Sequence, residues 1–284
     1  MSVKQLADDW IADRLAAGSI SLNTYKTYGQ HFRSLFTVVD PDLDIGELTT
    51  AHLRAWMRSQ GTMSQATKAT RLSAFRSFLD YCVREGLIDA NPADRVERPR
   101  IEQRKPRPAS LTDISAVLAA AGKDIRNGRR ICLMVLLECE MGLRRAETAG
   151  LRVEDIDWDD RIVLVRGKGR KERHVPLTAG VSDVLTLYLR QTKLTDGPLF
   201  RNQRTGEALT PASVGWLISR AGRRAGTKVT AHNYRHRAGT DIARSHGIHV
   251  AQHLLGHSSV STTQVYAQVD LDQVRAALAD RSYA

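Results

Sequence analysis

The chain has 284 residues, 42% of them hydrophobic, which is enough for one large or two modest domains with buried cores. A net charge of +11 and a pI of about 9.9 favour a polyanionic partner over an acidic or neutral one. Three cysteines without metal-binding spacing, no signal peptide and no long apolar run predict a protein of a reducing cytoplasm, away from the membrane.

Residues 1–97 are predicted to form a small helical domain. Apolar residues recur at helical spacing, and Ser, Thr or Asn residues stand where N-caps are needed. The predicted helices cover 2–17, from Ser21 or Asn23 to 36, from Thr49 or Thr50 onward, and from Ser64 through Cys82.

Residues 98–109 form a basic, proline-rich linker that contains Arg104, Lys105 and Arg107. Proline disfavours helix and keeps such a segment extended. Two interpretations stay open: a plain spacer, or a strap that lies along DNA phosphates.

Residues 110–284 are predicted to form a second domain, which carries 26 Lys and Arg against 18 Asp and Glu after residue 110. Two short strands at 161–165 and 173–177 flank a Gly-Lys-Gly turn. The predicted helices cover 111–121, 131–141, 181–194, 211–224, 232–246, 250–255 and 271–279. The expected fold class is mainly α with a small antiparallel β-sheet.

Five residues of this domain suit attack of a phenol oxygen on a phosphodiester. Arg144 and Arg235 can hold phosphate oxygens in bidentate geometry. His232 and His257 can donate to those oxygens or move protons, and Tyr266 can form a covalent intermediate.

The turn between the two strands is rich in basic residues. Lys168 is flanked by glycines, and its ammonium can protonate a leaving 5′ oxygen. The alternative is a solvated hairpin that only touches the phosphate backbone. The neighbouring basic residues are candidate DNA contacts: Arg166, Arg170, Lys171 and Arg173.

These motifs closely resemble the tyrosine recombinase family of phage integrases and Xer-type recombinases. Arg144 stands in Gly-Leu-Arg-x-x-Glu, Lys168 in the hairpin, His232 and Arg235 in His-x-x-Arg, His257 in Leu-Gly-His, and Tyr266 nine residues later. The resemblance covers nearly the whole chain. It implies an N-terminal SAM-like core-binding domain, an α+β catalytic domain, and these six residues as catalytic. Arg237 and the shortened segment 247–252 depart from the usual family pattern.

The resemblance also implies a mechanism and partners. The enzyme would form a 3′-phosphotyrosyl intermediate at double-stranded core sites and act as a homotetramer through a Holliday junction. The amphipathic C-terminal tail would dock on a neighbouring protomer; the alternative is that it packs on its own domain. An accessory DNA-bending or directionality protein is a further candidate partner.

No metal or cofactor is predicted. His246, His249, His253 and His257 recur at three- and four-residue spacing, but no acidic or cysteine ligand stands nearby. Arginines can supply the charge that magnesium supplies in other phosphoryl transfers.

The biological role stays open between several interpretations. The lack of an arm-binding domain suggests a short phage or mobile-element integrase, or an Xer-type chromosome or plasmid dimer resolvase, in the bacterial cytoplasm or nucleoid. A type IB topoisomerase and a catalytically silent DNA-binding protein are the remaining alternatives.

Overall fold

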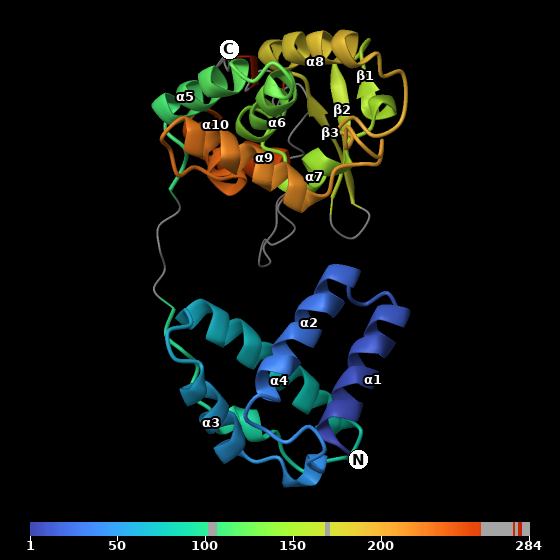
Figure 1. The fold of residues 1–284 in the computed structure, drawn as a ribbon, viewed down its shortest axis with the longest axis vertical. Coiled ribbons are helices and arrows are strands. Elements are labelled where there is room, and N and C mark those ends of the chain that lie inside the picture. Colours follow the sequence, from blue (N-terminus) through green and yellow to red (C-terminus); the bar gives the residue numbers. More distant parts are fainter. Residues whose placement is uncertain (102–106, 168–170, 257–274, 276–277, 280–284) are drawn as a thin grey trace. The chain divides into compact units, whose positions relative to one another are not determined.

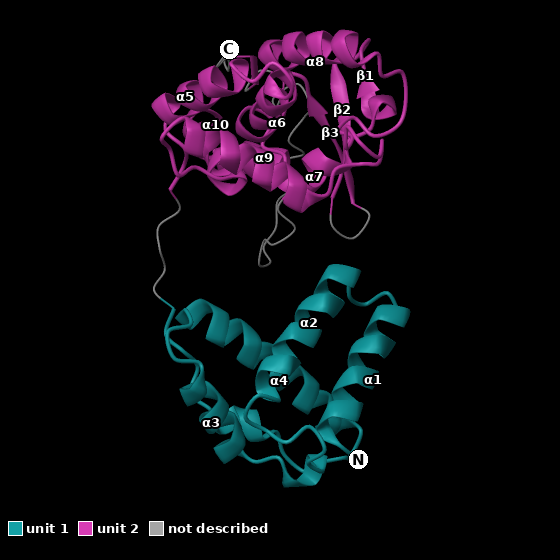
Figure 2. Cartoon of the chain, in the orientation of Figure 1, with its two compact units in different colours: residues 1–104 teal, residues 105–284 magenta. Residues whose placement is uncertain are grey.

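The computed structural model describes residues 1–101, 107–167, 171–256, 275 and 278–279. The chain forms two compact units, 1–104 and 105–284 (Figure 2), and the division falls within the segment predicted as a linker.

The regular secondary structure of residues 1–101 is helical. Ser21 and Ser64 each cap a helix by accepting a hydrogen bond from the backbone N–H three residues on, as their positions predicted. The helices are α1 (Val3–Ala16), α2 (Leu22–Leu35), α3 (Thr50–Ser59) and α4 (Gln65–Arg84), with short 3-10 turns η1 (Ile45–Glu47) and η2 (Pro92–Arg95).

Aromatic side chains fill the core of the first unit. Trp56 packs edge-on against Phe75 with ring centroids 4.8 Å apart, and Phe32 lies edge-on to Phe78 at 5.3 Å. Such edge-to-face pairs are favourable beyond the area that they bury. The first unit therefore has a packed hydrophobic core of its own.

The second unit wraps helices around one buried helix and covers one edge with a small sheet (Figure 1). Its elements are α5 (Leu111–Gly122), α6 (Gly128–Cys139), α7 (Arg145–Gly150), η3 (Val153–Asp155), β1 (Ile156–Asp157), β2 (Ile162–Arg166), β3 (Glu172–Pro176), α8 (Ala179–Thr192), α9 (Pro211–Arg224), α10 (Ala231–His246) and α11 (Ile248–Leu255).

Helix α6 forms the centre of this unit. It contacts α5, α8, α9 and α10, and its residues from Ile131 to Cys139 are buried except Cys132. A helix that is apolar on all sides is stable only when other elements surround it. Helix α6 ends five residues before Arg144, so its burial fixes the position of the backbone that leads to that arginine.

The sheet has the order β1-β2-β3 and is antiparallel throughout. Val163 pairs with Val175, and the two side chains are buried together with Val165. The predicted fold class, mainly α with a small antiparallel sheet, is confirmed. The sequence patterns missed α7 and β1, which have six and two residues.

The two departures from the family pattern have simple structural consequences. Gly247, with φ of 88°, ends α10 and immediately precedes α11, so the shortened segment becomes a one-residue break. Arg237 forms an ion pair at 2.7 Å with Asp241, one turn along α10.

Three residues near the C-terminus are described, and all are helical: Arg275, Leu278 and Ala279. Leu278 is only 2% exposed and belongs to the hydrophobic core of the second unit, while Arg275 donates to the carbonyl of Asp160 at 2.9 Å. Leu278 and Arg275 therefore contact their own unit in this structure of a single chain.

Replacing the buried Leu133 of α6 by alanine should lower the free energy of unfolding by about 3 kcal/mol, because a cavity opens at the centre of the second unit. Urea denaturation of Leu133→Ala measures this. Leu187→Ala on α8, where the side chain is 47% exposed, is the matched control and should change little. Equal losses in both variants would contradict a core centred on α6.

Candidate active site

Arg144 lies in a turn between two helices. After α6 ends, Gly142 adopts a φ of +66°, and a Cβ there would lie 2.9 Å from the side chain of Leu255. Glycine is required at such a position. Arg144 then stands at the N-cap of α7 with 39% of its side chain exposed, so it can face a substrate.

Glu147 is the buried centre of the site. Its side chain is 2% exposed, and its Oε1 accepts a hydrogen bond from Arg144 Nη1 at 2.8 Å. Its Oε2 accepts from the Arg144 backbone N–H at 2.7 Å and lies 3.8 Å from Arg235 Nη1. Glu147 therefore lies inside the protein and not on its surface.

Arg173, on β3, binds the same carboxylate in bidentate fashion. Its Nη1 and Nη2 lie 2.9 and 2.8 Å from the two oxygens of Glu147, and its Nε donates to the carbonyl of Leu254 at 3.0 Å. The sequence suggested a DNA-backbone contact for Arg173. In the structure the Arg173 side chain is 14% exposed, and these hydrogen bonds hold its guanidinium against Glu147 and Leu254.

The pKa of Glu147 reflects two opposing effects. Burial alone would raise it, but hydrogen bonds from Arg173 and from the backbone and side chain of Arg144, with the charge of Arg173, lower the pKa to about 2. Glu147 is therefore an anion at neutral pH.

Arg235, on α10, approaches the same cluster from the other side. It is 7% exposed and donates to the carbonyl oxygens of Gly142 and Leu255. Burial, followed by the neighbouring charge of Arg144, lowers its pKa to about 10, so it stays charged at neutral pH. His232 lies about one turn earlier on the same helix and is exposed.

Two glycines that directly precede predicted site residues lie close to this cluster. Gly256 accepts a hydrogen bond from Arg144 Nη2 at 3.2 Å, and a Cβ on Gly167 would lie 3.5 Å from Glu147 Oε1. His257 follows Gly256, and Lys168 follows Gly167, in the sequence. Six predicted site residues lie outside the described part of the chain: Arg104, Lys105, Lys168, Arg170, His257 and Tyr266.

The other predicted DNA contacts have different surroundings. The carbonyl of Arg107 accepts from Asn233 at 2.7 Å, which anchors the end of the linker to α10. Arg166 pairs with Asp155 at 2.5 Å and with Glu172 at 3.3 Å. Lys171 is exposed.

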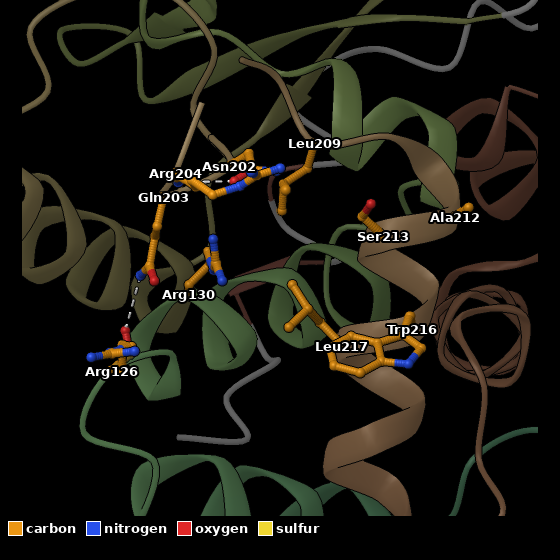
Figure 3. A pocket seen from close by; sticks show the side chains of 10 residues that line it. All are labelled: Arg126, Arg130, Asn202, Gln203, Arg204, Leu209, Ala212, Ser213, Trp216 and Leu217. Atoms are coloured by element: carbon orange, nitrogen blue, oxygen red, sulfur yellow. Dashed lines mark hydrogen bonds between the residues drawn. The ribbon is translucent and has the colours of Figure 1, made fainter. Parts of the chain in front are cut away.

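A second basic surface carries no sequence motif and was not predicted. It is a concavity of about 880 Å³, into which Arg126, Arg130 and Arg204 contribute guanidinium groups (Figure 3). Arg130 is 9% exposed and lines this concavity; its guanidinium donates to the carbonyl of Arg201 at 2.9 Å and to the side-chain oxygen of Asn127. Its other wall includes the exposed Trp216, whose ring lies 5.2 Å from the guanidinium of Arg220.

Neither a metal cluster nor a membrane-spanning helix occurs within the described ranges. No group of three or more His, Cys, Asp or Glu side chains there converges as a metal site requires. No described helix is both long and apolar enough to cross a bilayer.

Two protein-family models match the chain: the phage integrase family over residues 111–272, and the phage integrase N-terminal SAM-like domain over residues 7–86. The tyrosine recombinase XerC of Mycobacterium sp. (strain JLS) is 32% identical over 271 residues, covering 89% of this chain and 90% of the relative. XerD of Pseudomonas aeruginosa is 36% identical over 225 residues, covering 76% and 74%. A structure of a lambda integrase tetramer bound to a Holliday junction has a similar fold, with a TM-score of 0.75, 18% identity, and 95% and 81% coverage.

Glu147→Gln should be less stable than the wild type at pH 7 by about 3 kcal/mol, since it removes the anion that three arginines surround. The folded pKa is below the ordinary 4.5, so this stabilisation is present above that pH and is lost as the pH falls towards 2. Urea denaturation at several pH values should show the two proteins converging over this window. Glu207→Gln, at an exposed glutamate, should follow the wild type at every pH; a constant gap for Glu147→Gln would contradict the assignment.

Proposed function

Because the chain belongs to the phage integrase family and is a tyrosine recombinase, we propose that it cuts and rejoins two DNA duplexes at a specific core site through its own tyrosine. One observation carries the proposal: three guanidinium groups gather around a single buried carboxylate. Three guanidinium groups and one carboxylate leave a net charge of +2, which favours binding of a negatively charged phosphodiester.

Arg144 and Arg235 bind the two non-bridging oxygens of the scissile phosphate in this proposal. Charge builds up on those oxygens in the pentacoordinate transition state, and donors that are already in place stabilise it without reorganisation. The contacts to Glu147, Gly142, Leu255 and Gly256 hold both guanidiniums before the substrate arrives. His232 and His257 donate further hydrogen bonds to the phosphate.

Tyr266 attacks the phosphorus and becomes linked to the 3′ phosphate, while the 5′ oxygen leaves and takes a proton from Lys168. A 5′-hydroxyl of the partner duplex then attacks the phosphotyrosine and releases Tyr266. Each step exchanges one phosphodiester for another, so no external energy source is needed. Two successive strand exchanges pass through a Holliday junction.

The basic concavity around Arg130 adds a second anionic contact surface. Its guanidiniums, from Arg126, Arg130 and Arg204, belong to the same unit as the arginine cluster. We assign them to DNA phosphates outside the scissile position, where such contacts set affinity and register.

Four copies assemble on two duplexes in this proposal, through the C-terminal segment. Leu278 is buried in its own unit, so docking on a neighbour requires it to leave this core and fill the equivalent place in the next protomer. An exchange of identical contacts costs little because the same apolar area is buried before and after.

Two biological roles fit this chemistry. The phage integrase model favours integration and excision of a phage or mobile element, and the XerC and XerD relatives favour resolution of chromosome or plasmid dimers. The location of the cleaved site distinguishes them: a site at the border of an element supports the first role, and a chromosomal or plasmid resolution site supports the second.

Tyr266→Phe should bind duplex DNA like the wild type and form no covalent adduct, because the attacking oxygen is gone. The substrate is a duplex nicked beside a candidate core site taken from DNA that flanks the gene, and the adduct is measured on a denaturing gel without metal. An adduct with Tyr266→Phe would contradict the nucleophile. If the wild type relaxes plasmids that lack a target site, a topoisomerase is favoured. If the wild type binds the nicked duplex tightly but forms no adduct with it, a silent DNA-binding protein is favoured.

Lys168→Ala should slow cleavage of an ordinary phosphodiester by roughly 10²–10⁴-fold, because the leaving 5′ oxygen loses its acid. A substrate with a 5′-bridging sulfur, which leaves without a proton, should restore the rate. Lys171→Ala, at an exposed lysine of the same hairpin, is the matched control and should affect both substrates equally. If the sulfur substrate is not cleaved faster by Lys168→Ala, another group is the acid.

A further inference from the structure

His236 lies one helical turn after His232 on α10, and the two rings touch. Their Nε2 atoms are 2.7 Å apart, and the rings meet edge-on with centroids 4.1 Å apart. At this distance one nitrogen must carry a hydrogen and the other must present a lone pair. Two charged imidazolium rings, both with N–H groups at this position, are excluded.

The two rings differ in their surroundings. His232 is exposed, whereas His236 is half-buried, and its pKa is lowered by burial and then by His232 and Arg235. The proposed role of His232 requires an N–H on its other ring nitrogen, Nδ1, so its Nε2 must accept and His236 must donate. No hydrogen bond to Nδ1 of His232 occurs within the part of the chain that the structure describes.

We propose that His236 is a positioning residue: its Nε2–H donates to Nε2 of His232 and thereby fixes the orientation and the proton position of the His232 ring. This rests on the proposed role of His232 as a donor to the scissile phosphate. With Nε2 occupied as an acceptor, the proton of neutral His232 must sit on Nδ1. His232 then presents an N–H to the phosphate, where a free lone pair would be repelled.

The proton position can be read directly by nuclear magnetic resonance, without DNA. In protein labelled with ¹⁵N at histidine, the nitrogen shifts at pH 7.5 distinguish a protonated Nδ1 from a protonated Nε2, and His232→Gln and His236→Gln assign the signals. The wild type should show His232 protonated on Nδ1, and His236→Leu should move that proton to Nε2. Two results would overturn the proposal. One is a proton on Nε2 of His232 in the wild type, and the other is a proton that stays on Nδ1 of His232 in His236→Leu.

Kinetics provide the second test, with the rate of adduct formation on the nicked duplex as the readout. His236→Leu should slow the reaction about tenfold while duplex binding is retained, and His236→Gln, whose amide can still donate, should stay within about threefold of the wild type. His246→Leu, at a histidine near the end of the same helix, should react normally.

A double-mutant cycle separates positioning from a general structural effect. In a His232→Ala background, His236→Leu should cause no further loss of rate, because the ring on which it acts is absent. An equal tenfold loss in both backgrounds would show that His236 acts elsewhere. Failure of the wild type to form any adduct would count against the proposed function, while the nitrogen shifts would still decide the role of His236.

Discussion

The carboxylate of Glu147, shared by three arginines, is the interaction on which the second unit's site depends. Four hydrogen bonds at 2.7–2.9 Å reach its two oxygens from Arg144 and Arg173, and Arg235 lies 3.8 Å away. The arginines come from the start of α7, from β3 and from α10. A single buried charge thus connects a turn, a hairpin and a helix that are distant in sequence, and loss of any partner leaves a buried charge less well compensated.

The same connection explains how the site can be ready before DNA binds. Arg173 donates to both oxygens of the carboxylate and also bonds to Leu254, close to the end of α11. Arg144 reaches Gly256 at that end, and Arg235 bonds to Leu255. The three guanidiniums therefore fix one another and the backbone that leads into His257, so the groups that we propose to bind the phosphate need little rearrangement.

Local signals in the sequence predicted most of the fold, and the failures have physical reasons. Helical spacing predicted the longer helices of both units, and serine caps marked two helices of the first unit. Helix α7 has too few residues for a periodic pattern, and β1 is a two-residue strand. Arg173 resembled a hairpin surface residue because its partner is 26 residues earlier in the chain. The concavity around Arg130 gathers residues from two distant segments, 126–130 and 202–217, and no local pattern could have revealed it.

The comparison of two buried glutamates, Glu138 and Glu147, shows how strongly hydrogen bonds determine the pKa of a buried carboxyl group. Glu138 on α6 is fully buried, and neither of its oxygens has a hydrogen-bond partner among the described residues. Burial raises its pKa to about 8, although Arg145 and Arg235 oppose the shift, whereas Glu147 with its four donors has a pKa of about 2. Glu138 therefore holds its proton more readily than an ordinary glutamate, and Glu147 is the acid that pairs with the three guanidiniums among the described residues. Were both acids ionised, half of the excess positive charge would be cancelled, so the lack of donors around Glu138 helps keep the cluster suited to an anion.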